Sequence, residues 1–96
     1  MNKKQLVSLV SKECGYTQKD TERVIDALLN VITESLVIGE KVLLVGFGTF
    51  DVRKRKAREV KNPRNHSETI YVPETTAPFF KAGKNLRDAV NNKSNR

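Results

Sequence analysis

The sequence is poor in the residues that most often carry out chemistry: among its 96 residues are one cysteine, one histidine and no tryptophan. A single cysteine, Cys14, excludes an internal disulfide and a zinc site built from several cysteines, and we expect its side chain to be buried as a small apolar group. The lone histidine, His66, leaves no nucleophile–base pair and no metal cluster. The composition therefore predicts a protein that is not an enzyme and that uses no metal, cofactor or small-molecule substrate.

Long apolar runs are also missing. No segment approaches the roughly 18 apolar residues that a membrane-spanning helix needs. The apolar run that follows Met1-Asn2-Lys3-Lys4 is too short for a signal peptide. We therefore expect a cytoplasmic protein with no membrane partner.

Positive charge, by contrast, is in excess, and the whole excess lies in the second half of the chain. The formal net charge is +7; residues 1–50 carry six basic and six acidic side chains, whereas residues 51–96 carry twelve basic and five acidic ones. The segment Arg53–Arg64 alone holds seven basic residues against Glu59. A neutral half joined to a basic half indicates a scaffold attached to a surface that binds a polyanion.

Two helices are expected in the neutral half. Asn2, with Gln5 three residues later, is a capping box, and Gly15 is a helix stop. Thr17 begins a second helix, which Gly39 ends. The apolar stripe of this second helix consists of Val24, Ile25, Leu28, Leu29, Ile32 and Leu36. Such a stripe packs against something large, and because a chain of this length has a thin core, a partner chain is the natural candidate.

The hydrophobic period changes after the second helix. Lys41–Val45 and the segment around Phe50 are typical of strands, and Gly46-Phe47-Gly48 is typical of a tight turn between them. From Arg53 to about Val72 we expect a hairpin that lacks an apolar face and projects into solvent. Its turn is signalled by Asn62-Pro63. Later elements are expected as a strand at Ile70–Val72, a short strand at Phe79-Phe80, and a helix that bears Leu86, Ala89 and Val90.

The expected fold class is α+β, with an N-terminal helical pair, a three-stranded antiparallel sheet, a protruding β-hairpin arm and a short C-terminal helix. We expect one domain over residues 1–96. Its parts are a helical dimerisation base (1–40), a β saddle (41–82) with the arm at about 53–72, a C-terminal helix (83–91) and a polar tail (92–96).

The glycine turn carries a resemblance to a known family. Gly46-Phe47-Gly48-Thr49-Phe50, followed by spaced arginines and Asn62-Pro63, strongly resembles the HU/IHF family of bacterial histone-like DNA-binding proteins. The resemblance extends from Met1 to Val90, and residues 80–84 match a second family segment. It implies an intertwined dimer in which helical pairs form a base beneath a saddle of strands, and each subunit extends one arm into the DNA minor groove. An HU-like homodimer fits the chain better than an IHF subunit, with a heterodimer with a paralogue as the alternative.

The resemblance and the charge pattern together assign residues to DNA and to the dimer. By resemblance, Pro63 is the wedge inserted between base pairs, and Lys3 pairs with Asp26 in a bridge whose breaking frees Lys3 for DNA. The predicted DNA contacts are Lys3, Gly46, Arg53, Arg55, Arg58, Lys61, Asn62, Pro63, Arg64, Lys81, Lys84 and Arg87. The predicted dimer core is formed by Leu28, Leu29, Ile32, Leu36, Phe47, Phe50 and Phe79.

The arm tip departs from the family pattern. Val60 and Lys61 stand where glycine and arginine are usual, and the segment after Pro63 is one residue longer. The conformation of the tip is therefore open, and Pro63 either forms the wedge or only shapes the turn.

The predicted function is architectural: a nucleoid-associated protein that binds duplex DNA with little sequence preference, bends it and condenses the chromosome. Arginine suits the narrow minor groove because its planar, weakly hydrated head is easily desolvated. A site-specific, IHF-like bender is the alternative within the class, and an RNA-binding protein is the alternative outside it. A helix-turn-helix reader is rejected because the side chains that open the second helix, Lys19, Asp20, Glu22 and Arg23, sum to zero charge.

Overall fold

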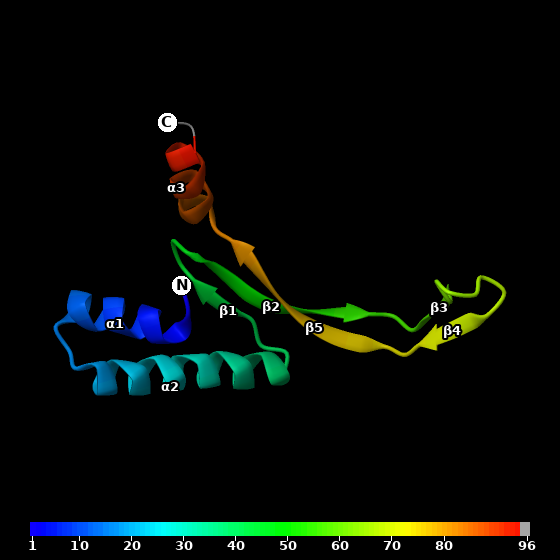
Figure 1. Ribbon diagram of the computed structural model, residues 1–96, viewed down its shortest axis with the longest axis horizontal. Helices are drawn as coiled ribbons and strands as arrows, with labels where there is room; N and C mark the ends of the chain where they lie inside the picture. Colours follow the sequence, from blue (N-terminus) through cyan, green and yellow to red (C-terminus); the bar gives the residue numbers. More distant parts are fainter. Residues whose placement is uncertain (95–96) are drawn as a thin grey trace.

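The computed structural model describes residues 1–94, which form a helical base, a sheet above it and a long hairpin arm (Figure 1). The elements, in chain order, are α1 (Lys3–Cys14), α2 (Gln18–Val37), β1 (Val42–Leu44), β2 (Gly48–Arg55), β3 (Arg58–Lys61), β4 (Thr69–Val72), β5 (Thr75–Ala82) and α3 (Lys84–Ser94). This order and the antiparallel sheet confirm the predicted α+β class.

Both N-terminal helices begin and end where the cap residues predict. The Asn2 side chain accepts a hydrogen bond from the Gln5 N–H at 2.8 Å while the Gln5 side chain accepts one from the Asn2 N–H at 2.9 Å, so the capping box is complete. The Thr17 hydroxyl oxygen accepts the Asp20 N–H at 3.1 Å. α1 ends at Gly15, whose φ of 73° favours glycine because other residues are strained there.

The end of α2 is a Schellman motif around Gly39. The Gly39 N–H donates to the Leu36 carbonyl at 3.0 Å and the Glu40 N–H donates to the Ser35 carbonyl at 2.8 Å. Gly39 itself has a φ of 79°. These two bonds satisfy carbonyls that the helix end would otherwise leave unpaired.

The sheet has the strand order β1-β2-β5 and is antiparallel throughout. The longer pairing joins β2 to β5 through eight residue pairs, from Gly48 opposite Ala82 to Arg55 opposite Thr75. β5 is therefore much longer than the short strand expected at Phe79-Phe80. Between β1 and β2, the Phe47 N–H donates to the Leu44 carbonyl at 2.9 Å and closes the predicted glycine turn.

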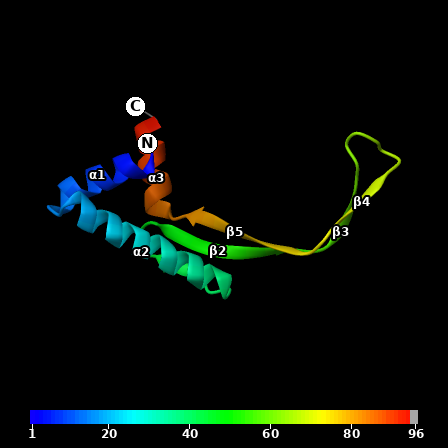
Figure 2. The ribbon, with the colours of Figure 1, turned by 60° about the horizontal axis from the view of Figure 1, so that its bottom comes forward.

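The arm continues the β2–β5 pair as a second, two-stranded sheet made of β3 and β4. The arm leaves the sheet and curves away from α2, so that the molecule has a concave side opposite that helix (Figure 2). The radius of gyration is 19.2 Å, against roughly 12–13 Å for a compact chain of this length.

Very little of the chain is buried. Val7 is the one buried apolar side chain among the described residues, and the polar residues Ser11 and Thr21 are also buried. The accessible surface is 8404 Å², whereas a compact monomer of this mass exposes about 5,600 Å². The prediction of a buried Cys14 is wrong for the single chain, in which this residue is exposed, because α1 ends there with no element packed over it.

The C-terminal helix is longer than predicted. It spans Lys84–Ser94 instead of 83–91, so it begins one residue later and continues through polar residues that were expected to form the tail. Of the expected tail at 92–96, residues 95 and 96 lie outside the described part of the chain.

Gly48 supplies a direct test of the packing between β2 and β5. A Cβ atom at this position would lie 2.5 Å from the Cζ atom of Phe80 and 2.6 Å from the carbonyl oxygen of Lys81. The Lys81 carbonyl belongs to the backbone and cannot move away as the end of a flexible side chain can. Gly48→Ala should therefore lower the free energy of unfolding by about 2–3 kcal/mol. Thermal unfolding at fixed protein concentration measures this loss.

The control is Gly15→Ala, where an added Cβ meets nothing within 4 Å but φ is 73°. The left-handed backbone alone should cost about 1 kcal/mol there. Equal midpoints for the two variants would contradict the packing explanation at Gly48.

Candidate nucleic-acid interface

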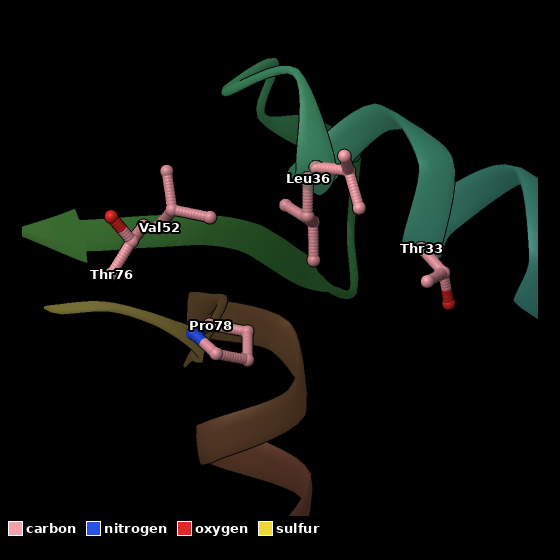
Figure 3. Close-up of a pocket in the computed structure, with 6 residues that line it drawn as sticks. Thr33, Leu36, Val52, Thr76 and Pro78 are labelled. Atoms are coloured by element: carbon pink, nitrogen blue, oxygen red, sulfur yellow. The ribbon is translucent and has the colours of Figure 1, made fainter.

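The β2–β5 register divides the side chains of the sheet between two faces. One face carries Phe50 opposite Phe80 and Val52 opposite Pro78, and the Phe50 and Phe80 ring centroids lie 4.8 Å apart. This face meets the end of α2 across an open apolar hollow (Figure 3). The volume of the hollow is about 480 Å³. The hollow is lined by Thr33, Leu36, Val37, Val52, Thr76 and Pro78. We call this side the helix-facing face.

The other side, which we call the open face, presents the predicted arm arginines. It carries Arg53 opposite Ala77, Arg55 opposite Thr75, and Lys81 opposite Thr49. The side chains of Arg53, Arg55 and Lys81 are exposed. Lys54, opposite Thr76, falls on the helix-facing face. Three predicted DNA contacts, Arg53, Arg55 and Lys81, thus share a surface that α2 does not cover.

Phe79 also lies on the open face, because it pairs with Asp51 in the same register. The Arg53 Cζ atom is 4.6 Å from the centroid of the Phe79 ring. The sequence analysis placed Phe79 in the dimer core with Phe47 and Phe50. That placement stays a prediction, but Phe79 lies on the opposite side of the sheet from Phe50 and Phe80.

The outer part of the arm is not uniformly polar. Val60 pairs with Ile70, and Arg58 pairs with Val72, so these four side chains share one face of the hairpin. The prediction of an arm without an apolar face is therefore wrong for its outer part. The reason is the register: it sets Val60 directly opposite Ile70, a pairing that inspection of either strand alone does not reveal.

The arm tip is closed by two successive turns between Asn62 and Glu68. The Asn65 N–H donates to the Asn62 carbonyl at 3.2 Å, and the Glu68 N–H donates to the Asn65 carbonyl at 3.0 Å. In each turn the asparagine Oδ1 accepts the N–H two residues on, from Arg64 at 2.9 Å and from Ser67 at 3.3 Å. The segment after the proline is thus held by two turns in succession.

Pro63 and Arg64 lie exposed at this tip. Asn62, also a predicted DNA contact, has a structural task as well, because its Nδ2 donates to the Glu68 Oε2 at 3.3 Å. The paired asparagines at 62 and 65 were the available signal for this double turn, since asparagine side chains commonly bond the backbone two residues on. The predicted contact Lys61 pairs with Thr69 just before the tip.

Lys3 forms an ion pair with Asp26 that joins the first turn of α1 to α2, as the family resemblance implied. The pKa of Lys3 is raised above its ordinary value, first by the side-chain hydrogen bond to Asp26 and then by the charge of that carboxylate. A raised lysine pKa means that the bridge is fully present below the ordinary value of 10.5 and is lost only above it. Lys3 is therefore charged and paired at neutral pH.

The remaining predicted contacts cluster where α3 leaves the sheet. Lys84 is the first residue of α3, and the Arg87 N–H donates to the Gly83 carbonyl at 3.0 Å in its first turn. Gly46 has a φ of 86° and lies beside this turn, with the Asn85 Nδ2 at 3.7 Å from where a Cβ would stand. The site residues at the glycine turn and at the start of α3 are thus brought together by the fold.

Most of the side chains assigned to the dimer core remain accessible in the single chain. Leu28 is 50% exposed, Leu29 is 49% exposed and Phe47 is 48% exposed, while Ile32, Leu36 and Phe50 are half-buried. Further exposed apolar side chains on the base and sheet are Val24, Val31, Val37, Ile38, Leu43 and Val45. No helix in the described chain is long and apolar enough to cross a membrane.

Comparison with known proteins places the chain in a family. The family described as bacterial DNA-binding protein matches residues 1–91. The DNA-binding protein HU of Clostridium pasteurianum is 50% identical over 91 residues, which cover 95% of this chain and 99% of that protein. HU of Lactococcus lactis is 49% identical over 89 residues, covering 93% of this chain and 97% of its own.

Solved structures agree. Anabaena HU in a cocrystal with DNA is 44% identical, has a TM-score of 0.86, and matches over 94% of this chain and 97% of that one. Thermotoga maritima HU has a TM-score of 0.66 at 36% identity, over 94% of this chain and 98% of that one. A match over nearly the whole chain, in sequence and in fold, means that this protein belongs to the HU/IHF family of bacterial DNA-binding proteins.

Proposed function

We propose that this protein is an architectural DNA-binding protein that binds duplex DNA with little sequence preference, bends it and condenses the bacterial chromosome in the nucleoid. The observation that carries the proposal is the curved basic arm: Arg53 and Arg55 on the open face, and Pro63 and Arg64 exposed at its tip. Anabaena HU, which shares this fold, was crystallised with DNA.

The charge of the arm suits a phosphate backbone. Each phosphate that the arm neutralises releases condensed counterions, so affinity falls as salt rises. The minor groove distinguishes little beyond A·T from G·C pairs, which accounts for weak sequence preference. Lys81, Lys84 and Arg87 extend the positive surface from the sheet to α3 and supply contacts for a duplex that bends around the body.

Pro63 suits a wedge between base pairs. Its ring is rigid and apolar, and it has no N–H to leave unpaired inside the stack. Separating a base step costs a few kcal/mol, which the additional contacts along a bent duplex offset. The double turn supports this role because hydrogen bonds on both sides of Asn65 hold the tip in one shape.

The protein acts as a homodimer in this proposal. The single chain exposes roughly 2,800 Å² more than a compact monomer of its mass would, although the extended arm accounts for part of this excess. Obligate dimer interfaces bury 2,000 Å² or more in total. A second copy would cover the exposed apolar stripe of α2 and the loop after β1, which carries Val45 and Phe47.

The dimer is tested on α2. Leu28→Gln, at a half-exposed position of the stripe, should shift the sedimenting species from twice 10.9 kDa toward 10.9 kDa, because an unpaired amide would be buried in the interface twice. Asn30→Gln, on the polar side of the same helix, should leave the mass at the dimer value. A wild-type protein that sediments as a monomer at micromolar concentration would refute the dimer.

The wedge is tested by Pro63→Ala. Energy transfer between dyes at the ends of a short duplex should report a smaller bend, while the dissociation constant changes by less than about threefold, since phosphate contacts supply most of the affinity. Arg64→Ala, at the neighbouring tip position, should do the reverse and weaken binding with the bend retained. An unaltered bend in Pro63→Ala would remove the wedge role.

The arm is tested by its salt dependence. The double variant Arg55→Ala and Arg58→Ala should weaken duplex binding and lower the slope of log affinity against log salt by roughly 0.9 for each phosphate that the arm no longer neutralises. The control, Lys12→Ala with Lys19→Ala, removes the same charge from the helical base and should leave the slope unchanged. If the two double variants behave alike, net charge and not the arm governs binding.

Competition identifies the class of nucleic acid in the same assay. Duplex DNA of random sequence should displace the bound duplex as effectively as an unlabelled copy of that duplex does. A complex that resists random DNA would indicate a site-specific bender, and tighter binding of structured RNA at matched salt would indicate an RNA-binding protein.

A further inference from the structure

Phe79 occupies an unusual place for a large apolar side chain, because it lies on the open face of the sheet. The β2–β5 register puts it opposite Asp51, while Phe50 and Phe80 turn toward the helix-facing side. α2 does not cover the open face, because it meets the sheet from the other side, across the hollow lined by Val52, Thr76 and Pro78. Phe79 is nevertheless only half-exposed.

Arg53 is the group that lies over the Phe79 ring. It pairs with Ala77, two residues from Phe79 along β5, so the two side chains are diagonal neighbours on one face. The distance of 4.6 Å from the Arg53 Cζ to the ring centroid is that of a cation–π contact. It is the one such contact that the structure gives for residues 1–94.

The stack leaves the charge of Arg53 available. The one ion pair of the described chain joins Lys3 to Asp26, and the Asp51 carboxylate on the same face as Arg53 accepts the N–H of its neighbour Val52 at 2.7 Å. The N–H donors of a guanidinium lie in its plane, so a head that rests on a ring still presents them at its edge. Arg53 is therefore held in position without being neutralised.

Holding an arginine in position has a consequence for binding. A free arginine side chain loses much conformational entropy when an anion fixes it, and this loss weakens the complex. Arg55 lies two residues further along the same strand and face, with an exposed side chain opposite Thr75. The two arginines thus form a natural comparison, one stacked on a ring and one not.

We propose that Phe79 is a positioning residue for DNA binding: its ring holds the Arg53 guanidinium against the open face, with the N–H edge directed to the phosphate backbone of the bound duplex. The proposal rests on the proposed function, because it assigns to DNA the anion that Arg53 meets. It gives Phe79 a task on the DNA side of the sheet in place of one in the dimer core.

The test compares Phe79→Leu with Phe79→Tyr in binding to a short duplex. Leucine keeps apolar bulk but has no ring, so affinity should fall roughly two- to fivefold, as expected for loss of an exposed cation–π contact. Tyrosine keeps the ring and should bind as the wild type does. Equal affinity for the wild type and Phe79→Leu would overturn the proposal.

A double-mutant cycle separates positioning from a merely structural role. In an Arg53→Ala background Phe79→Leu should have no further effect, whereas in an Arg55→Ala background its full effect should remain. The same loss in both backgrounds would show that Phe79 acts through the fold and would overturn the proposal.

Two further measurements keep the outcome unambiguous. Should Phe79→Leu fail to fold, Arg53→Lys keeps the charge without the planar stack and should weaken binding more than Arg55→Lys does; equal effects would overturn the proposal. Absence of duplex binding by the wild-type protein would refute the proposed function itself, whereas wild-type binding with an unaffected Phe79→Leu variant refutes the role of Phe79 alone.

Discussion

The antiparallel pairing of β2 with β5 sets the two faces of the sheet and leads into the arm. Its eight residue pairs run from the packed end at Gly48 to the root of the arm at Arg55. Because strand side chains alternate, one register sends Phe50 and Val52 toward α2 and sends Arg53 and Arg55 to the open face. A register slip of one residue would exchange these two sets of side chains. The arginines would then lie between the sheet and α2, and the apolar side chains would be exposed. Gly48 pins that register, because only a residue without a Cβ fits against Phe80 and the Lys81 carbonyl.

The same ladder explains how so small a chain supports so long an arm. A two-stranded hairpin is only marginally stable alone, but this one is continuous with a sheet that rests on α2. Its outer half gains a small apolar face from Val60, Ile70 and Val72, and its end is closed by the hydrogen bonds of Asn62 and Asn65. Residues 1–50 carry no net charge, so the net positive charge of the chain falls on residues 51–96, which hold the arm, β5 and α3.

Apolar side chains and net positive charge are thus concentrated in different parts of the chain. The base and the inner sheet carry most of the apolar side chains, yet Val7 is the one buried apolar side chain among the described residues. The core is unfinished within one chain, which is the physical reason for placing a second copy in the proposed assembly. Lys3 and Asp26 tie the two helices of the base to each other at the surface.

Local chemistry determined much of this protein from the sequence alone. The helix ends and the glycine turn follow from residues that act over short range, and the split of charge is visible in the composition. The Lys3–Asp26 pair joins two helices and was implied only by the family resemblance. Only the tertiary structure determines the features that depend on which strands are paired and in which register. The pairing of Val60 with Ile70 and the position of Phe79 beneath Arg53 each require the register between paired strands. Periodicity identifies a strand with two faces, but only its partners determine which face is covered.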